Sequence, residues 1–132
     1  MNRVTIDEIT NFGITEFKDL CSSFMSELGF TTVQLEVENP NKIVGSGYIE
    51  LGIISYKFVF AFFRNQSIIT ENDTNDVRNL ASKTLADKGL ILTTGSISRA
   101  AKKRAKPKGD YIPIDFMDHI ELSKRLEKYT DI

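Results

Sequence analysis

The chain has 132 residues, of which 41% are hydrophobic and 27% charged, as in an ordinary globular protein, and this length suits one domain over residues 1–132. A net charge of −1 excludes binding of polyanions by bulk charge, and one Cys and one His exclude a disulfide framework or a Cys/His zinc cluster. No apolar run approaches the ~20 residues that span a bilayer. The N-terminus also lacks the apolar core of a signal peptide, so we expect a cytoplasmic protein without membrane contacts.

The first third of the chain predicts two helices and a strand. Residues 1–13 form an N-terminal extension, in which the capping-box spacing of Thr5 and Glu8 favours a short helix at residues 6–11. Apolar residues at helical spacing predict a helix over residues 15–28, capped by Thr15 and ended by Gly29. Its apolar stripe is Phe17, Leu20, Cys21, Phe24, Met25 and Leu28, so Cys21 is expected to be a buried core thiol. Alternating polarity predicts a half-buried strand over residues 31–37.

The stretch from Gly45 to Arg64 predicts a β-hairpin with strands over residues 48–54 and 57–63 and a turn at Ser55-Tyr56. The second strand is apolar on both faces, which is typical of a strand in the middle of a covered sheet. Its phenylalanines and Phe30 are expected in the core, with a subunit interface as the alternative.

The second half of the chain alternates helices with short strands. We expect helices over residues 74–88, 97–105 and 118–129 and strands over residues 90–93 and 111–114. The last helix should be anchored by Ile120, Leu122, Leu126 and Tyr129, and His119 near its start should be a surface or capping residue. This order predicts an α/β fold with a mixed sheet and helices on both faces.

Four segments resemble one family: FKDLCSSFMSELGF, GSGYIEL, GLILTTGSISRAAKKRA and YIPIDFMDHIELSKRL. Together they resemble the Mrr type of the restriction-endonuclease-like, or PD-(D/E)xK, superfamily over about residues 15–128. The resemblance implies the fold of that superfamily and, in active members, metal-dependent cleavage of DNA. In such enzymes carboxylates hold a divalent cation that activates water, and a Lys helps to orient that water.

The catalytic pattern of the family is incomplete in this chain. The resemblance places Lys18 at the acid position of the first helix, Glu50 at the strand Asp, and Ala61 and Phe63 at the Glu/Gln and Lys positions. With a turn at Ser55-Tyr56, Glu50 should pair opposite Ala61, and Lys57 should lie on the same face on the order of 13 Å along the strand. Arg64 should point to the other face. The only candidate metal ligands are Glu50, Glu16 and Asp19, so neither a catalytic site nor a bound metal is expected.

A basic segment follows the LTTGSIS sequence. Six positive charges fall within ten residues, which leaves −7 for the remainder of the chain (−1 − 6), and they are Arg99, Lys102, Lys103, Arg104, Lys106 and Lys108. A solvated helix face is one interpretation. Phosphate contact is the other, with Thr94-Gly95-Ser96 supplying free N–H groups at the helix start, and the resemblance places it slightly ahead.

The resulting hypothesis is a pseudo-nuclease that binds DNA or another nucleic acid, or serves as an assembly subunit, and forms a homodimer or contacts a protein partner. The first alternative is a divergent Mg²⁺-dependent endonuclease using Glu50 with Glu16 or Asp19. The second is a purely structural protein-interaction domain.

Overall fold

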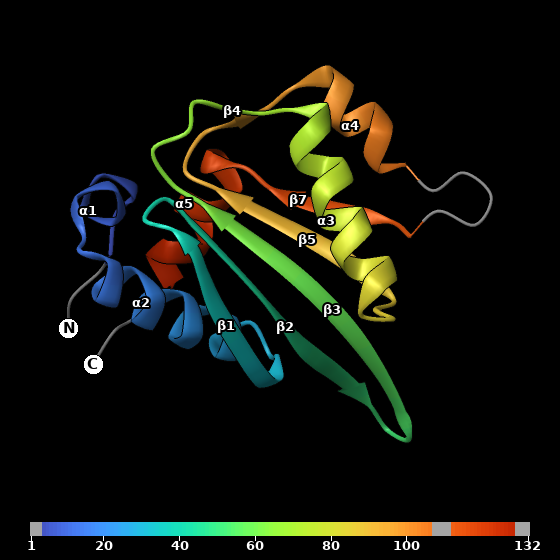
Figure 1. The fold of residues 1–132 in the computed structure, drawn as a ribbon. Coiled ribbons are helices and arrows are strands. Elements are labelled where there is room, and N and C mark those ends of the chain that lie inside the picture. The colour runs from blue at the N-terminus through green and yellow to red at the C-terminus, as the bar shows by residue number, and fades with distance from the viewer. Residues whose placement is uncertain (1–3, 107–111, 129–132) are drawn as a thin grey trace.

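The computed structural model describes residues 4–106 and 112–128. A five-stranded mixed sheet runs through the molecule in the order β1-β2-β3-β5-β7, with β1, β2 and β3 antiparallel and β3, β5 and β7 parallel (Figure 1). Its strands are β1 (Thr31–Asn39), β2 (Lys42–Leu51), β3 (Ile54–Phe63), β5 (Lys88–Thr93) and β7 (Ile114–Met117). The short strands β4 (Ile68–Ile69) and β6 (Ser96–Ile97) form a separate parallel pair that the sequence did not predict.

Helices cover both faces of the sheet, as predicted. The helices are α1 (Ile6–Asn11), α2 (Ile14–Glu27), α3 (Glu71–Lys83), α4 (Arg99–Ala105) and α5 (His119–Lys128). One core cluster contains residues of α1, α2 and α5, and the other contains residues of α3 and α4 (Figure 1). None of the described helices is long and apolar enough to cross a membrane.

Strand β3 is the middle strand, and its side chains enter both cores. Phe60 and Phe62 face α2, where the Phe62 ring lies 5.4 Å from the Phe17 ring in an edge-to-face arrangement. Val59, Ala61 and Phe63 face α3 and α4. The predicted position of the phenylalanines in the core is therefore confirmed, because burial on both faces is what a double-faced apolar strand requires.

The hairpin differs from the prediction in its turn. The loop is Gly52-Ile53 rather than Ser55-Tyr56, and β2 starts at Lys42. Gly52 adopts φ 63°, which a two-residue hairpin loop demands and which glycine takes without steric cost. Gly45 lies within β2, where the backbone of β1 comes too close for a side chain. A Cβ at this position would lie 2.3 Å from the Gln34 carbonyl oxygen.

Two helix starts were predicted one to three residues too late. Helix α2 starts at Ile14, and the Glu16 carboxylate accepts the Gly13 N–H at 3.2 Å, so Thr15 is not its cap. Helix α3 starts at Glu71 because Thr70 and Asp73 form a reciprocal capping box. It ends at Lys83, well before Gly89, which lies in β5.

The C-terminal elements also shift. The last strand spans Ile114–Met117 instead of residues 111–114, and Asp118 caps α5 by accepting two backbone N–H groups. Leu122 and Leu126 are buried as predicted, whereas Ile120 is 55% exposed because it lies on the opposite side of the helix. Tyr111 and Tyr129 lie outside the described residues.

Candidate functional site

Ala61 and Phe63 lie in the packed core between the sheet and α3. Their exposed fractions are 0% and 2%, and they belong to one apolar cluster with Val77 and Ala81 of α3. Alternation along β3 places both side chains on this face. Apolar side chains therefore fill the place at which the resemblance expects a carboxylate or amide and an amine.

The hairpin register separates Glu50 from these positions. Glu50 pairs opposite Ser55, and Ala61 pairs opposite Val44. The expected pairing of Glu50 with Ala61 is thus wrong, since the turn at Gly52-Ile53 shifts β2 along β3. Ser55 and Ala61 are six positions apart, which corresponds to about 20 Å along a strand. Glu50 is exposed near the tip of the hairpin.

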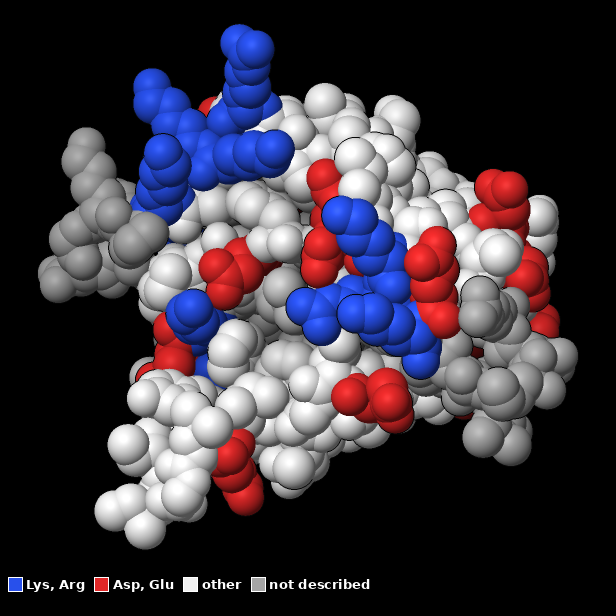
Figure 2. Space-filling model, turned by 180° about the vertical axis from the view of Figure 1, so that it is seen from behind, with Lys and Arg blue, Asp and Glu red and all other residues white. Residues whose placement is uncertain are grey.

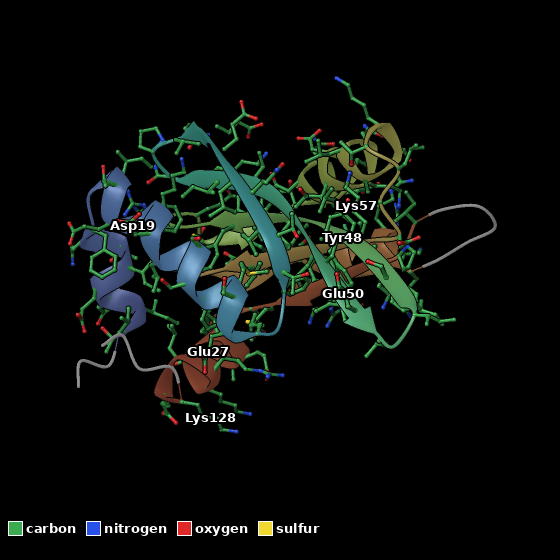
Figure 3. The ribbon with its side chains drawn as sticks, turned by 90° about the horizontal axis from the view of Figure 1, so that it is seen from below. Asp19, Glu27, Tyr48, Glu50, Lys57 and Lys128 are labelled. Carbon is green, nitrogen blue, oxygen red and sulfur yellow. The ribbon has the colours of Figure 1, made fainter. Side chains whose placement is uncertain are left out.

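The acidic residues of α2 do not approach Glu50 either. Glu16 caps the start of its own helix, and Lys18 and Asp19 are exposed. Figure 3 shows Asp19 and Glu50 in separate parts of the molecule, Asp19 on α2 and Glu50 toward the hairpin tip. Among the residues that the structure describes, no three His, Cys, Asp or Glu side chains form a group that could hold a metal ion.

Lys57 lies on the same face as Ala61, four residues along β3, as expected. Its ammonium group donates to the Thr84 carbonyl at 3.0 Å. Its backbone N–H donates to the Asp87 carboxylate at 2.9 Å, and the Asp87 N–H donates to the Lys57 carbonyl at 2.8 Å. These bonds tie the end of α3 to β3, so Lys57 has a structural role.

Arg64 points to the other face, as predicted, and serves the fold there. It is buried and donates to the carbonyl oxygens of Pro40, Ile9 and Phe12. Its guanidinium carbon also lies 4.3 Å from the centre of the Phe17 ring. The residue after the apolar strand therefore joins the N-terminal helices to the sheet, a role that the sequence pattern does not reveal.

Cys21 and His119 both occupy the structural positions expected from the sequence. Cys21 is buried as expected, and this burial raises the pKa of its thiol far above the usual range. His119 is exposed, and both its backbone N–H and its ring Nδ1 lie at hydrogen-bond distance from the Gly95 carbonyl, at 2.9 Å and 3.0 Å. His119 therefore links the start of α5 to the turn before α4.

Helix α4 presents exposed cations. Arg99, Lys102, Lys103 and Lys106 are exposed, whereas Ala101 and Ala105 bury the opposite side of the helix. Arg104 differs from them because it forms an ion pair with Glu71 of α3. Lys108, the sixth basic residue of the predicted segment, lies outside the described residues.

The turn before α4 does not offer the free N–H groups that the sequence suggested. The backbone N–H of Thr94 donates to Phe63, that of Gly95 to the Thr93 hydroxyl, and that of Ser96 to Ser67. The helix begins later, at Arg99, with Ser98 as its cap. Thr94 and Ser96 are therefore not phosphate-binding amides in this arrangement.

A second basic group, which we did not predict, lies on α5. Lys124, Arg125 and Lys128 are exposed, and Arg125 pairs with Glu121 at 3.1 Å. Figure 2 shows the two basic groups on one side of the molecule, one over α4 and one over α5, with acidic side chains between them. The signal was present in the sequence, since residues 124 and 128 are one helical turn apart.

Two hollows are candidate binding sites, and only the first borders the basic groups. One, of about 410 Å³, lies between α4 and α5 and is lined by Lys102 and Arg125 together with Asp118 and Glu121. The other, of about 540 Å³, lies between α3 and the outer strands. Its lining combines the carboxylates of Glu36, Glu38 and Asp76 with the amines of Lys42 and Lys83, and Lys42 pairs with Glu38 at 2.7 Å.

Comparisons with solved structures agree with the fold. The chain is similar to the DNA modification-dependent restriction endonuclease AspBHI, with 15% identity and a TM-score of 0.51 over 93% of this chain and 35% of that one. It is also similar to the MspJI restriction endonuclease in complex with a 27-mer oligonucleotide, with 17% identity and a TM-score of 0.50 over 83% of this chain and 26% of that one. The chain thus spans about a third or less of the length of these enzymes.

A comparison with curated proteins finds no match. The family model of the Mrr catalytic domain, described as a restriction endonuclease, matches residues 9–126. That match covers most of the chain and includes α2, the central hairpin, the turn before α4 and most of α5. The chain therefore belongs to the Mrr-type restriction endonuclease family.

Proposed function

We propose that this chain is a nuclease-fold protein that binds DNA without cutting it and acts as a subunit of an assembly. The observation that carries the proposal is the burial of Ala61 and Phe63, the residues that the resemblance places at the Glu/Gln-x-Lys positions. A hydrophobic side chain can neither coordinate a cation nor orient a water molecule.

The residues of the expected site do not fit a metal ion. Mg²⁺ requires near-octahedral oxygen coordination and usually takes one or two carboxylates together with substrate phosphates. Glu50 is a single exposed carboxylate about 20 Å along the sheet from Ala61. The proposal therefore includes no resident metal.

The cations of α4 supply the proposed contact with DNA. Arg99, Lys102, Lys103 and Lys106 are exposed on a short helix at the edge of the molecule, and exposed Lys and Arg side chains neutralise phosphates with release of counterions. The solved structure of MspJI with a 27-mer oligonucleotide supports nucleic acid as the ligand of this fold. Lys124 and Lys128 are exposed on α5 and add a second basic group on the same side of the molecule.

A cleavage assay tests the loss of catalysis. The purified chain is incubated with supercoiled, linear and single-stranded DNA, and with RNA, in Mg²⁺ or Mn²⁺. We expect no cleavage and no saturable Mn²⁺ binding by electron paramagnetic resonance. Cleavage that is abolished by Glu50→Ala would overturn the proposal, and cleavage that survives this change yet co-purifies with the chain would place a working site elsewhere.

Binding is measured separately on the same preparations. We expect the chain to shift a duplex of about two helical turns at low salt, with an affinity that falls as salt rises. Tighter binding to RNA than to DNA would show that the ligand is RNA and not DNA. Absence of binding to either at low salt would leave only the structural, protein-interaction alternative.

A further inference from the structure

The end of the β2–β3 hairpin projects beyond the helical layers (Figure 1). Its side chains are apolar and open to solvent: Leu51 is 62% exposed, Ile54 51% and Tyr56 40%, and Ile53 is fully exposed. The sequence holds no charged residue between Glu50 and Lys57. Figure 2 shows this end as a lobe without Lys or Arg. Clustered exposed apolar residues on a projecting element mark a contact surface.

The backbone at this end is also open on one edge of β3. Strand β5 pairs only with Phe58–Phe63, and Asp87 covers the next position by bonding the N–H and C=O of Lys57. Because backbone groups alternate in direction along a strand, those of Ser55 point to the same side as those of Lys57. Strand β5 does not reach Ser55, and no hydrogen bond joins the outward N–H or C=O of Ser55 to another described residue.

We infer that a second copy of this chain docks here, with the two hairpin ends antiparallel about a two-fold axis. Asp87 already occupies the place beside Lys57, so the second copy can align only with the residues before Lys57. The axis then falls at Ile54. The Ser55 N–H of each copy donates to the Ile53 carbonyl of the other, because the Leu51–Ile54 pair that closes the hairpin leaves that carbonyl pointing outward, and the two Ile54 side chains lie against each other.

Self-association fits this edge better than capture of an extended peptide. The open stretch covers only residues 53–55 before Asp87 closes the edge, which is too short to add a peptide strand but equals the length that a second copy offers. The uncharged tip also brings no like charges together at the axis. Residues 53–55 of one copy contact residues 53–55 of the other, as a two-fold interface requires.

The size of the surface sets the expected affinity. A few exposed apolar side chains fall short of the ~800 Å² per partner of a standard stable interface. We therefore expect a dimer that dissociates on dilution, with a dissociation constant on the order of 10 to 100 µM. This inference specifies the assembly part of the proposed function and does not depend on DNA binding.

Sedimentation velocity over a concentration series tests the inference on the full chain. We expect the unmodified chain to pass from monomer to dimer, and Ile54→Lys to remain a monomer. Ser55→Pro should also remain a monomer, because proline removes an outward N–H and leaves the ladder bonds to β2 intact. The matched control is Ile120→Lys, a residue of similar exposure on α5, which should dimerise like the unmodified chain.

A cross-link fixes the geometry. Ile54→Cys places two thiols across a non-hydrogen-bonded antiparallel pair, where the Cα atoms are about 4.5 Å apart, within the range of a disulfide. Cys21 is buried and does not compete. We expect a disulfide dimer on mild oxidation of Ile54→Cys and little from Ile120→Cys.

A monomer at every concentration would overturn the inference, and so would a dimer that Ile54→Lys and Ser55→Pro leave unchanged. DNA binding by monomeric Ser55→Pro is measured in parallel. If this variant binds DNA but does not dimerise, dimerisation and DNA binding are independent properties. If even the unmodified chain fails to bind DNA, the dimerisation result still stands.

Discussion

Charge reversal on α4 gives the sharpest test of DNA binding. Lys102 and Lys103 are exposed and take part in no ion pair among the described residues, while Ala101 and Ala105 carry the packing of the helix. Replacing both lysines by Glu should therefore leave the fold intact and change only the charge presented to phosphates. The net charge of the chain falls from −1 to −5 (−1 − 4).

The size of the effect follows from the number of available cations. Four exposed cations, Arg99, Lys102 and Lys103 on α4 and Lys106 at its C-cap, have no ion-pair partner in the described part of the chain, whereas Arg104 is held by Glu71. Four phosphate contacts predict a slope of about −3.6 in log K against log salt, which is a ~150-fold loss of affinity between 50 and 200 mM salt. The double variant should retain a slope of about −1.8 and lose only ~12-fold over that range.

Fluorescence anisotropy with a labelled duplex, titrated at several salt concentrations, measures both slopes. The matched control reverses Lys18 and Lys83, two exposed lysines on α2 and α3, and gives the same net charge. We expect the control to keep the slope of the unmodified chain. Equal slopes for the α4 variant and the unmodified chain would remove α4 from the interface. Equal losses in the α4 variant and the control would show that bulk charge alone governs binding.

Two further predictions concern the framework of the fold. Arg64→Met should lower the free energy of unfolding by about 2–4 kcal/mol, because three carbonyl groups lose a charged donor; urea denaturation measures this, and a change below about 1 kcal/mol would refute it. Gly45→Ala should cost about 1–3 kcal/mol, since its Cβ would meet the Gln34 carbonyl at 2.3 Å. Gly13→Ala, whose Cβ would have an ordinary 3.6 Å contact, is the control, and equal melting temperatures for the two variants would contradict the argument.

Local sequence patterns were sufficient to predict which face of each helix or strand is buried. Apolar spacing located α2 and predicted that its stripe is buried, and the two-sided apolar pattern of β3 placed that strand in the middle of the sheet. Alternation along β3 also predicted that Ala61 and Phe63 share one face and that Arg64 points to the other. These properties depend on the period of a helix or strand, which the order of residues encodes directly.

Hydrogen-bond partners and register were decided only by the tertiary structure. The free N–H groups expected at residues 94–96 are taken by acceptors such as Phe63 and Ser67, about thirty residues earlier in the chain. The position of Glu50 depended on the turn, because moving the loop to Gly52-Ile53 changes every pair along the hairpin. The partners of a backbone group come from segments that are distant in sequence, so a local pattern shows which face a residue occupies but not what lies opposite it.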